Sequence, residues 1–486
     1  MKRLRLFLVL VVSLSVTACG GSVALEEDGF AVAATKSDLA AMARFANDNG
    51  LVATFNVNGA IDTSSDNAFF RSMGENGRTC GTCHVPKENW SITPSGVRQR
   101  FDATDGLDPI FRTNDGSNSP TADVSTTKAR RAAYSMLLTK GLIRVGIGIP
   151  ANAEFELVAV DDPYGYASAA ELSLFRRPLP TTNLRFLTAT MWDGRESTPV
   201  SDALRGPNAS ESDLATQANS ATVGHAQALA ALPPSTREEI VRFELGLFTA
   251  QTDTRFAGSL DDAGAQGGVS ALSTQLNYFG INDVLAGDSR TGAPFDPLAM
   301  TAFNGWSSVE GPRSSARRAI ARGQALFNTR PIAISGVRGV NDALAIPILQ
   351  GTCTTCHDAP NVGNHSVRLP LDLGLTDASR RTPDMPLYTL CKRQVDASGG
   401  PIPGTCDSNV PPIQTTDPGV ALISGKWAQV ATFKGPILRA LSGRGPYFHN
   451  GSAATLADVV EFYDSRFNMG LTAAEKADLA AFLGAL

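Results

Sequence analysis

The chain has 486 residues, of which 43% are hydrophobic and 18% are charged, and its formal net charge is −5 at pH 7. This length is sufficient for two or three globular domains. The slightly acidic balance, without a cluster of Lys and Arg, lacks the basic face that nucleic-acid phosphates require and argues against a nucleic-acid partner.

The N-terminus has the pattern of an export signal. Basic residues at the start precede an apolar run over residues 6–16, and the stretch ends in VTAC, with Cys19 as its last residue. These four letters resemble the bacterial lipoprotein box, in which the cysteine carries the lipid; a plain secretory signal that contains a cysteine is the alternative. The run is too short to span a hydrocarbon core of ~30 Å. We predict a signal peptide at residues 1–19 and a periplasmic protein that contacts the membrane only through a lipid anchor on Cys19.

One five-residue pattern occurs twice, as CGTCH at residues 80–84 and as CTTCH at residues 353–357. In C-x-x-C-H the two thiols bind one haem covalently and the histidine ligates its iron. C-x-x-C also occurs in thiol oxidoreductases and in zinc sites, but an exported chain favours haem. We therefore expect two covalently bound haem c groups, with the attachment residues Cys80, Cys83 and His84 for the first and Cys353, Cys356 and His357 for the second.

Helical periodicity dominates the rest of the chain. Ser235-x-x-Glu238 has the pattern of a capping box before EEIVRFELGLF, and a second helix is expected at residues 315–327, just before the second haem motif. Two more helices are expected, one from Thr455 through TLADVVEFY and one after Thr472-x-x-Glu475. A helix, then a haem motif, then irregular chain and a terminal helix form the organisation of a c-type cytochrome domain.

This organisation appears twice and predicts a mainly α fold with two cytochrome c-like haem domains, long loops and few short strands. A stretch rich in Gly and Ser at residues 254–272 separates the two copies. The predicted boundaries are an N-terminal haem domain at residues 20–250, a linker or extended loop region at 251–313 and a C-terminal haem domain at 314–486.

The seven cysteines can all be assigned. One takes lipid and four take haem, which leaves Cys391 and Cys406 at the two ends of a loop rich in Pro and Gly. Thiols are usually paired in an oxidising compartment, and a disulfide that closes such a loop stabilises a protein by ~3 kcal/mol. We predict this disulfide; two unpaired surface thiols are the alternative.

The first haem has few candidates for a sixth ligand nearby. The chain holds five histidines, and none lies between His84 and His225. Met136 and Met191 are available, but both also suit core positions. We therefore expect the first iron to be five-coordinate or water-bound, and so open to peroxide.

Four further segments, together with the haem motifs, resemble the bacterial di-haem cytochrome c peroxidase and MauG superfamily. They are MWDGRE (191–196), DLATQA (213–218), FKGPILRAL (433–441) and GRGPYFHNGSAATLADVVEFYD (443–464). The resemblance implies an N-terminal haem that reacts with hydrogen peroxide, a six-coordinate C-terminal haem that relays electrons, and Trp192 between the two. From the sequence pattern alone, Trp192 also suits a core position beside a turn.

The resemblance assigns only part of the peroxide pocket. Gln217 matches the pocket glutamine of the family, but the family's acid/base glutamate falls near Gln227 and is therefore missing. His225 can stand in for it, because an imidazole can carry the proton that peroxide cleavage moves. A structural histidine bonded to backbone is the alternative.

For the second haem, the resemblance places the sixth ligand at Tyr463, with Met469 as the competing ligand. A thioether raises the iron potential, whereas a phenolate favours higher oxidation states. His449 matches a family histidine that is not an axial ligand and is expected to bond a haem propionate. His365 bonds a group that itself contacts the haem, serves as an alternative ligand, or is a surface histidine.

The resemblance further implies calcium between the haems, held by backbone carbonyls and an Asn, but the matching stretch FRRPLP around Arg177 has no Asn. The leading hypothesis is a periplasmic di-haem peroxidase that reacts with hydrogen peroxide and shares oxidising equivalents between its haems, as MauG does, with a redox protein or a protein substrate as partner. A conventional cytochrome c peroxidase and a non-catalytic electron-transfer cytochrome are the alternatives. A homodimer is left open.

Overall fold

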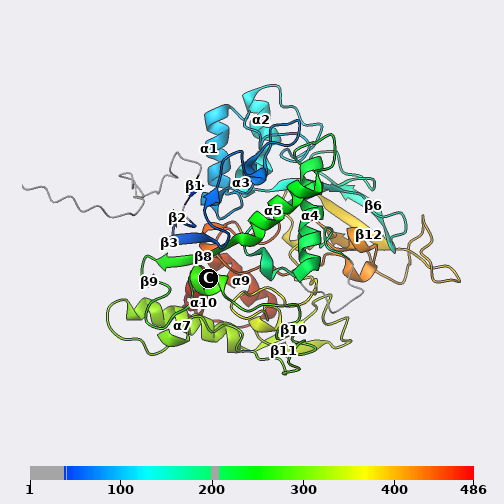
Figure 1. Ribbon diagram of the computed structural model, residues 1–486. Helices are drawn as coiled ribbons and strands as arrows, with labels where there is room; N and C mark the ends of the chain where they lie inside the picture. Colours follow the sequence, from blue (N-terminus) through cyan, green and yellow to red (C-terminus); the bar gives the residue numbers. More distant parts are fainter. Residues whose placement is uncertain (1–37, 40, 199–206) are drawn as a thin grey trace, which may run out of the picture.

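The computed structural model describes residues 38–39, 41–198 and 207–486, coloured along the chain in Figure 1. The predicted signal peptide and the lipid site at Cys19 lie outside these ranges. Among the described helices, none combines the length and the apolar character that a membrane span requires.

Helices make up 29% of the described residues and strands 18%. The fold is therefore mixed, and the expectation of a mainly α protein with few strands is only partly right. The additional strands come from segments such as GLVATFN and FELVAVD, whose β-branched and aromatic residues suit a pleated, half-buried surface.

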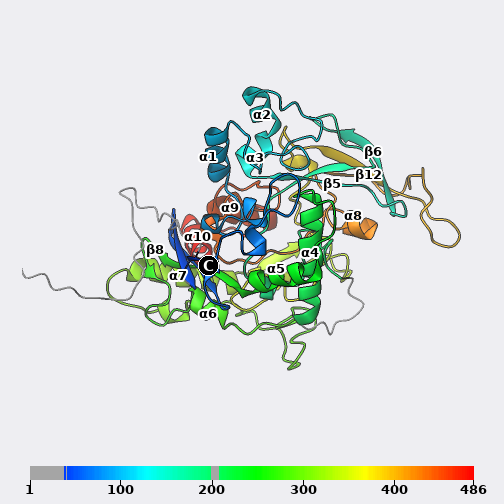
Figure 2. The same ribbon diagram turned by 45° about the horizontal axis from the view of Figure 1, so that its top comes forward.

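The helices have the following bounds: α1 Pro94–Thr104, α2 Thr127–Ala133, α3 Ser135–Lys140, α4 Pro207–Gly224, α5 Pro234–Gly246, α6 Val269–Ser273, α7 Ser314–Thr329, α8 Ala421–Ser424, α9 Leu456–Phe467 and α10 Ala473–Ala485. In Figure 1, α1 to α3 lie at the top of the molecule and α7 lies at the bottom. α4 and α5 pack side by side, as do α7 and α10 (Figure 2).

The strands have the following bounds: β1 Asp38–Leu39, β2 Met42–Asn47, β3 Gly50–Asn56, β4 Ile61–Asp62, β5 Ile143–Ile147, β6 Phe155–Asp161, β7 Leu172–Arg176, β8 Leu247–Thr254, β9 Gly258–Ser259, β10 Ile332–Ser335, β11 Ile348–Gly351, β12 Leu387–Lys392 and β13 Ile413–Thr415. Their pairings are antiparallel, in small sheets ordered β2-β3-β8-β9, β13-β12-β6, β1-β4, β5-β7 and β10-β11. β6 and β12 come from opposite halves of the chain, so this sheet ties the two halves together.

The four predicted helices are confirmed. α7 covers the stretch before the second haem motif, and α9 and α10 begin after reciprocal capping boxes at Thr455 and Thr472. The predicted box at Ser235 is wrong, although its helix exists. α5 already begins at Pro234, because a proline at the first helical position supplies the helical φ angle without needing its missing N–H.

The predicted linker region contributes to the core of the C-terminal helices. Phe303 and Trp306 are fully buried and belong to the same hydrophobic cluster as Ile320 of α7 and Phe482 of α10. The indole N–H of Trp306 donates to the carbonyl of Asp262 over 2.8 Å. Residues 251–313 therefore pack as part of the fold, and the domain boundaries stay a prediction.

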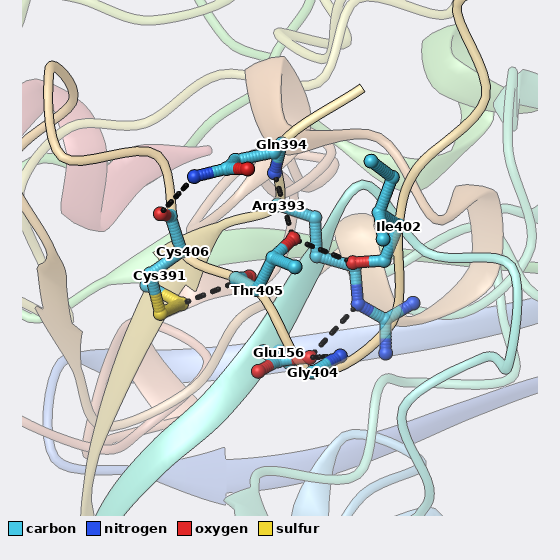
Figure 3. Close-up of a disulfide and its surroundings, with 8 residues drawn as sticks. All are labelled: Glu156, Cys391, Arg393, Gln394, Ile402, Gly404, Thr405 and Cys406. Atoms are coloured by element: carbon cyan, nitrogen blue, oxygen red, sulfur yellow. Dashed lines mark hydrogen bonds and ion pairs between the residues drawn. A yellow bond between two sulfur atoms is a disulfide. The ribbon is translucent and has the colours of Figure 1, made fainter. Parts of the chain in front are cut away.

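The predicted disulfide between Cys391 and Cys406 is confirmed, with a Cα–Cα distance of 5.6 Å. It closes the loop between β12 and β13 (Figure 3). Glu156 of β6 anchors the same loop, because its carboxylate pairs with Arg393 at 3.1 Å and accepts the backbone N–H of Gly404 at 2.9 Å.

Candidate haem-binding cavities

Both haem motifs fold into the same local structure. Cys80–Thr82 and Cys353–Thr355 form short 3₁₀ turns, each opened by a threonine whose backbone N–H donates to the hydroxyl of the threonine three residues later at 2.9 Å. The backbone N–H of each motif histidine then bonds the carbonyl of the first cysteine, at 3.0 Å for His84 and 3.1 Å for His357. One helical turn thus gathers two thiols and an imidazole, and none of these four cysteines forms a disulfide.

The two motif histidines are oriented in the same way. The Nδ1 of His84 lies 3.1 Å from the carbonyl oxygen of Trp90, and the Nδ1 of His357 lies 2.6 Å from that of Gly363. A carbonyl only accepts, so Nδ1 carries the hydrogen and Nε2 keeps its lone pair. Burial lowers the pKa of His84 to about 4 and also lowers that of His357. Neutral imidazoles with a free Nε2 and a bonded Nδ1 are suited to ligate iron.

Each motif opens into its own large cavity. Cavity 1 is lined by Cys80, Cys83 and His84, and cavity 2 by Cys353, Cys356 and His357. Their empty volumes are about 1580 and 1540 Å³, including space open to solvent. Both have room for a large planar cofactor.

The two cavities share a wall. Trp192, Lys434 and Pro436 line both of them. The indole N–H of Trp192 donates to the carbonyl of Arg177 at 2.8 Å, and its own carbonyl accepts the backbone N–H of Lys434 at 3.0 Å. This bonding fixes the indole within the wall. Trp192 therefore lies between the two cavities, and its role in electron transfer is a proposal.

Three cations without counter-ions, of which Arg177 is buried and the other two are half-buried, test whether cavity 1 fits haem. Arg177, Arg444 and Lys434 line cavity 1, and burial lowers their pKa values to about 10, about 10 and about 7. Within the described ranges, none of the three has a carboxylate ion-pair partner. Unpaired buried charge is costly, so this wall requires anionic groups. The two propionates of a haem meet that requirement, and the residues present fit the cofactor.

The guanidinium of Arg177 lies among backbone carbonyls. It donates to the carbonyls of Ile92 at 2.8 Å, Arg444 at 3.1 Å, Lys140 at 3.2 Å and Gly141 at 3.3 Å. Backbone carbonyls are also typical calcium ligands. The stretch that the resemblance matches to a calcium-binding segment therefore carries a cation, the Arg177 guanidinium.

Cavity 1 brings together the polar residues expected at the peroxide site. Gln217 of α4 and His225, just beyond its end, both line the cavity. Gln227 is exposed and does not line it, so no acid/base group stands at that position. His225 bonds the carboxylate of Asp115, which also lines the cavity, so its side chain is not bonded to backbone.

Of the two methionines considered as ligands of the first haem, only one lines cavity 1. Met191 lines cavity 1, whereas Met136 is buried in a cluster with Leu142, Phe175 and Met385 and is absent from the cavity wall. Met73, which the sequence did not single out, also lines cavity 1.

Cavity 2 contains both candidates for the sixth ligand. Tyr463 of α9 and Met469, just after this helix, line it together. Among the described residues, the Tyr463 hydroxyl has no hydrogen-bond partner, and burial raises the pKa of Tyr463 above its usual value. A phenolate would therefore need a cation beside it, which a haem iron supplies.

His449 and His365 are both buried and both line cavity 2. The Nε2 of each has no hydrogen-bond partner in the part of the chain that the structure describes. His449 stacks on Phe433 with ring centroids 4.0 Å apart and lies 6.1 Å from the Trp192 ring. His365 is not a surface histidine, since it is 3% exposed; its Nδ1 lies 3.4 Å from the carboxylate of Asp358.

Sequence reasoning missed several residues of the cavity walls: Arg78, Asp115, Glu244, Lys434 and Arg444. Two of these residues could have been found from the sequence. Arg78 lies two residues before Cys80, and Lys434 lies within a segment of the resemblance. Asp115 carried none, because its contact with the end of α4 exists only in the fold.

No family model matches the chain. A stretch of 146 residues, 28% of the chain, is 32% identical to 36% of cytochrome-c peroxidase IdrP1 from Pseudomonas sp. (strain SCT). Cytochrome-c peroxidase IdrP2 from Denitromonas iodatirespirans is 31% identical over 147 residues, which cover 28% of this chain and 36% of that protein. These matches show distant, partial homology and span little more than a third of the length of the curated relatives. A solved structure of Kuenenia stuttgartiensis hydrazine synthase aligns with a TM-score of 0.30 and 16% identity over 81% of this chain and 93% of that one, a likeness too low to carry an argument.

Proposed function

We propose that this chain is a periplasmic di-haem oxidoreductase that reduces hydrogen peroxide in cavity 1 and exchanges electrons with a second haem in cavity 2. The observation that carries the proposal is the pair of C-x-x-C-H cavities that share a wall at Trp192. The partial homology to cytochrome-c peroxidases supports the same reaction.

Haem groups at the two motifs would supply one iron for the reduction of peroxide and one for the storage or relay of an electron. The chain holds them through the motif cysteines and through His84 and His357. We assign Arg177, Arg444 and Lys434 to the propionates, because these buried or half-buried cations lack counter-ions. His449, whose Nε2 is unpartnered, is assigned to a propionate of the second haem.

In cavity 1, Gln217 and His225 act on peroxide. The side-chain amide of Gln217 donates a hydrogen bond that orients the peroxide, and His225 carries the proton that moves from one peroxide oxygen to the other. Trp192 serves as an intermediate station for electrons, since it lies in the wall that both cavities share. Calcium between the haems remains an expectation. The Arg177 guanidinium already bonds backbone carbonyls in the stretch where that ion is expected.

The sixth ligand of the second haem separates two forms of this function. Tyr463 as a ligand favours a MauG-like enzyme that shares oxidising equivalents and oxidises a protein side chain. Met469, which also lines cavity 2, favours a conventional peroxidase that receives electrons from a small redox protein.

The test uses the purified, fully ferric protein with one equivalent of hydrogen peroxide and no reductant, followed by optical and electron paramagnetic resonance (EPR) spectra. We expect the ferric signals of both haems to disappear. Reaction only after one haem has been reduced would identify the conventional peroxidase. Absence of a reaction in either state would overturn the proposal and leave an electron-transfer cytochrome.

A further inference from the structure

A buried carboxylate holds His225 at cavity 1. The Nδ1 of His225 bonds the Oδ2 of Asp115, and their side chains are 36% and 8% exposed. Asp115 lies in the loop between α1 and α2, and His225 directly follows α4, so that 110 residues separate the two partners. The fold, and not proximity in the sequence, therefore brings these two side chains together.

Arg78 fixes the carboxylate from the other side. It is 3% exposed and bonds the Oδ1 of Asp115 through Nη1, which also donates to the backbone carbonyl of His225 at 3.1 Å. Its Nε and Nη2 donate to the carbonyls of Pro109 at 2.8 Å and Ile110 at 2.7 Å. Arg78 thus joins the first haem motif, the Asp115 loop and the residue that follows α4.

This arrangement determines which nitrogen of His225 carries the hydrogen. Burial alone would raise the pKa of Asp115, but hydrogen bonds and charge from His225 and Arg78 hold it below its usual value. An ionised carboxylate only accepts, so Nδ1 must be the donor. Whenever the ring is neutral, the lone pair therefore lies on Nε2, which has no partner within the described ranges.

Building on the function proposed above, we propose that Asp115, held by Arg78, is a positioning residue that keeps His225 in the tautomer whose Nε2 accepts a proton from hydrogen peroxide. The pair supplies at His225 the acid/base group that is absent at Gln227. Asp115 acts only through His225, in the way that a buried aspartate orients a catalytic histidine in hydrolases.

Protons and electrons balance when the O–O bond of peroxide is cleaved. His225 takes a proton from the peroxide oxygen that stays and returns it to the oxygen that leaves, while the O–O bond breaks and its electron pair departs on the leaving oxygen as water. The remaining oxygen becomes a second water after it gains two electrons and two protons. A one-electron donor protein would supply these electrons, which haem groups held at the two motifs could carry, and His225 ends the step unchanged.

Asp115→Asn tests the proposal sharply because Arg78 dictates how the new amide is oriented. The Arg78 N–H requires an acceptor, so the amide oxygen must face Arg78 and the NH₂ group must face His225. Nδ1 then becomes the acceptor and Nε2 carries the hydrogen, so that it can no longer take a proton. We expect the rate constant for reaction with peroxide, and that for association of hydrogen cyanide with the first haem, each to fall by about 100-fold.

Asp108→Asn is the matched control. Asp108 lies in the same loop and pairs with Arg100, but it does not line cavity 1. It removes one aspartate and one ion pair without touching His225, so both rate constants should stay at the wild-type level. The unchanged spectrum of the second haem reports that each variant is folded.

A double-mutant cycle with His225→Gln separates positioning from a structural role. If Asp115 acts through His225, Asp115→Asn has no further effect on either rate in the His225→Gln background. Losses of rate that multiply in the double variant would overturn the proposal. A low-spin first haem that becomes high-spin in His225→Gln would also overturn it, because His225 would then be an axial ligand. If the wild type does not react with peroxide, the proposed function fails, and the cyanide cycle still decides the role of Asp115.

Discussion

Replacement of Tyr463 by phenylalanine is expected to change the optical spectrum of the second haem and to raise its reduction potential. Tyr463 lines cavity 2, and its hydroxyl has no hydrogen-bond partner among the described residues. A phenolate stabilises the ferric state, and axial ligands tune haem potentials over about 0.8 V, so we expect a rise on the order of 0.1 V or more. Potentiometric titration of both haems measures this change.

Met469→Leu is the counterpart of this variant, because Met469 lines the same cavity and leucine preserves most of its volume. If Tyr463 is the ligand, Met469→Leu leaves the spectrum and the potential of the second haem at their wild-type values. A shift in Met469→Leu with none in Tyr463→Phe would assign the thioether as ligand and favour the conventional peroxidase.

Replacement of Glu244 by glutamine is expected to stabilise the protein as the pH rises. Glu244 of α5 is 3% exposed, its Oε2 has no hydrogen-bond partner among the described residues, and burial raises its pKa from 4.5 to about 8. The folded state therefore holds this proton more tightly than the unfolded state does. Stability from this group is fully present below pH 4.5 and is lost as the pH rises to about 8, at about 1.4 kcal/mol per pH unit.

Glutamine does not ionise, so the free energy of unfolding of Glu244→Gln should exceed that of the wild type by a few kcal/mol at pH 8 and equal it near pH 4. Urea unfolding at several pH values measures the difference. Glu238→Gln, at an exposed position of the same helix, controls for the loss of a carboxylate. A difference between Glu244→Gln and the wild type that does not change with pH would show that Glu244 is not held protonated.

The parts of the fold that follow from local chemistry could be predicted from the sequence. The helix after Thr472-x-x-Glu475 and the pairing of Cys391 with Cys406 depend on neighbouring residues or on elimination, and both were found, whereas the capping box predicted at Ser235 was wrong. The short strands were underestimated. A strand such as β6 is stable only through its pairing with the distant β12, which no local pattern reveals.

The candidate site divides in the same way. The haem attachment residues were evident because their spacing within one turn carries the chemistry. Asp115 was not, because its role depends on the end of α4, 110 residues away. Lys434 and Arg444 lie within segments of the resemblance, but their lack of a counter-ion is seen only in the fold.

The central claim, that two haem cavities exchange electrons through the wall that carries Trp192, is tested most directly with Trp192→Phe. This variant keeps an aromatic ring but removes the indole and its bond to the carbonyl of Arg177. Trp427→Phe, in a hydrophobic cluster elsewhere, is the matched control.

One equivalent of hydrogen peroxide is added to each ferric protein, and the EPR signals of the two haems are followed in time. In the wild type and in Trp427→Phe, both ferric signals should disappear together. In Trp192→Phe, the signal of the first haem should disappear while that of the second persists. Loss of both signals at the wild-type rate in Trp192→Phe would contradict the account.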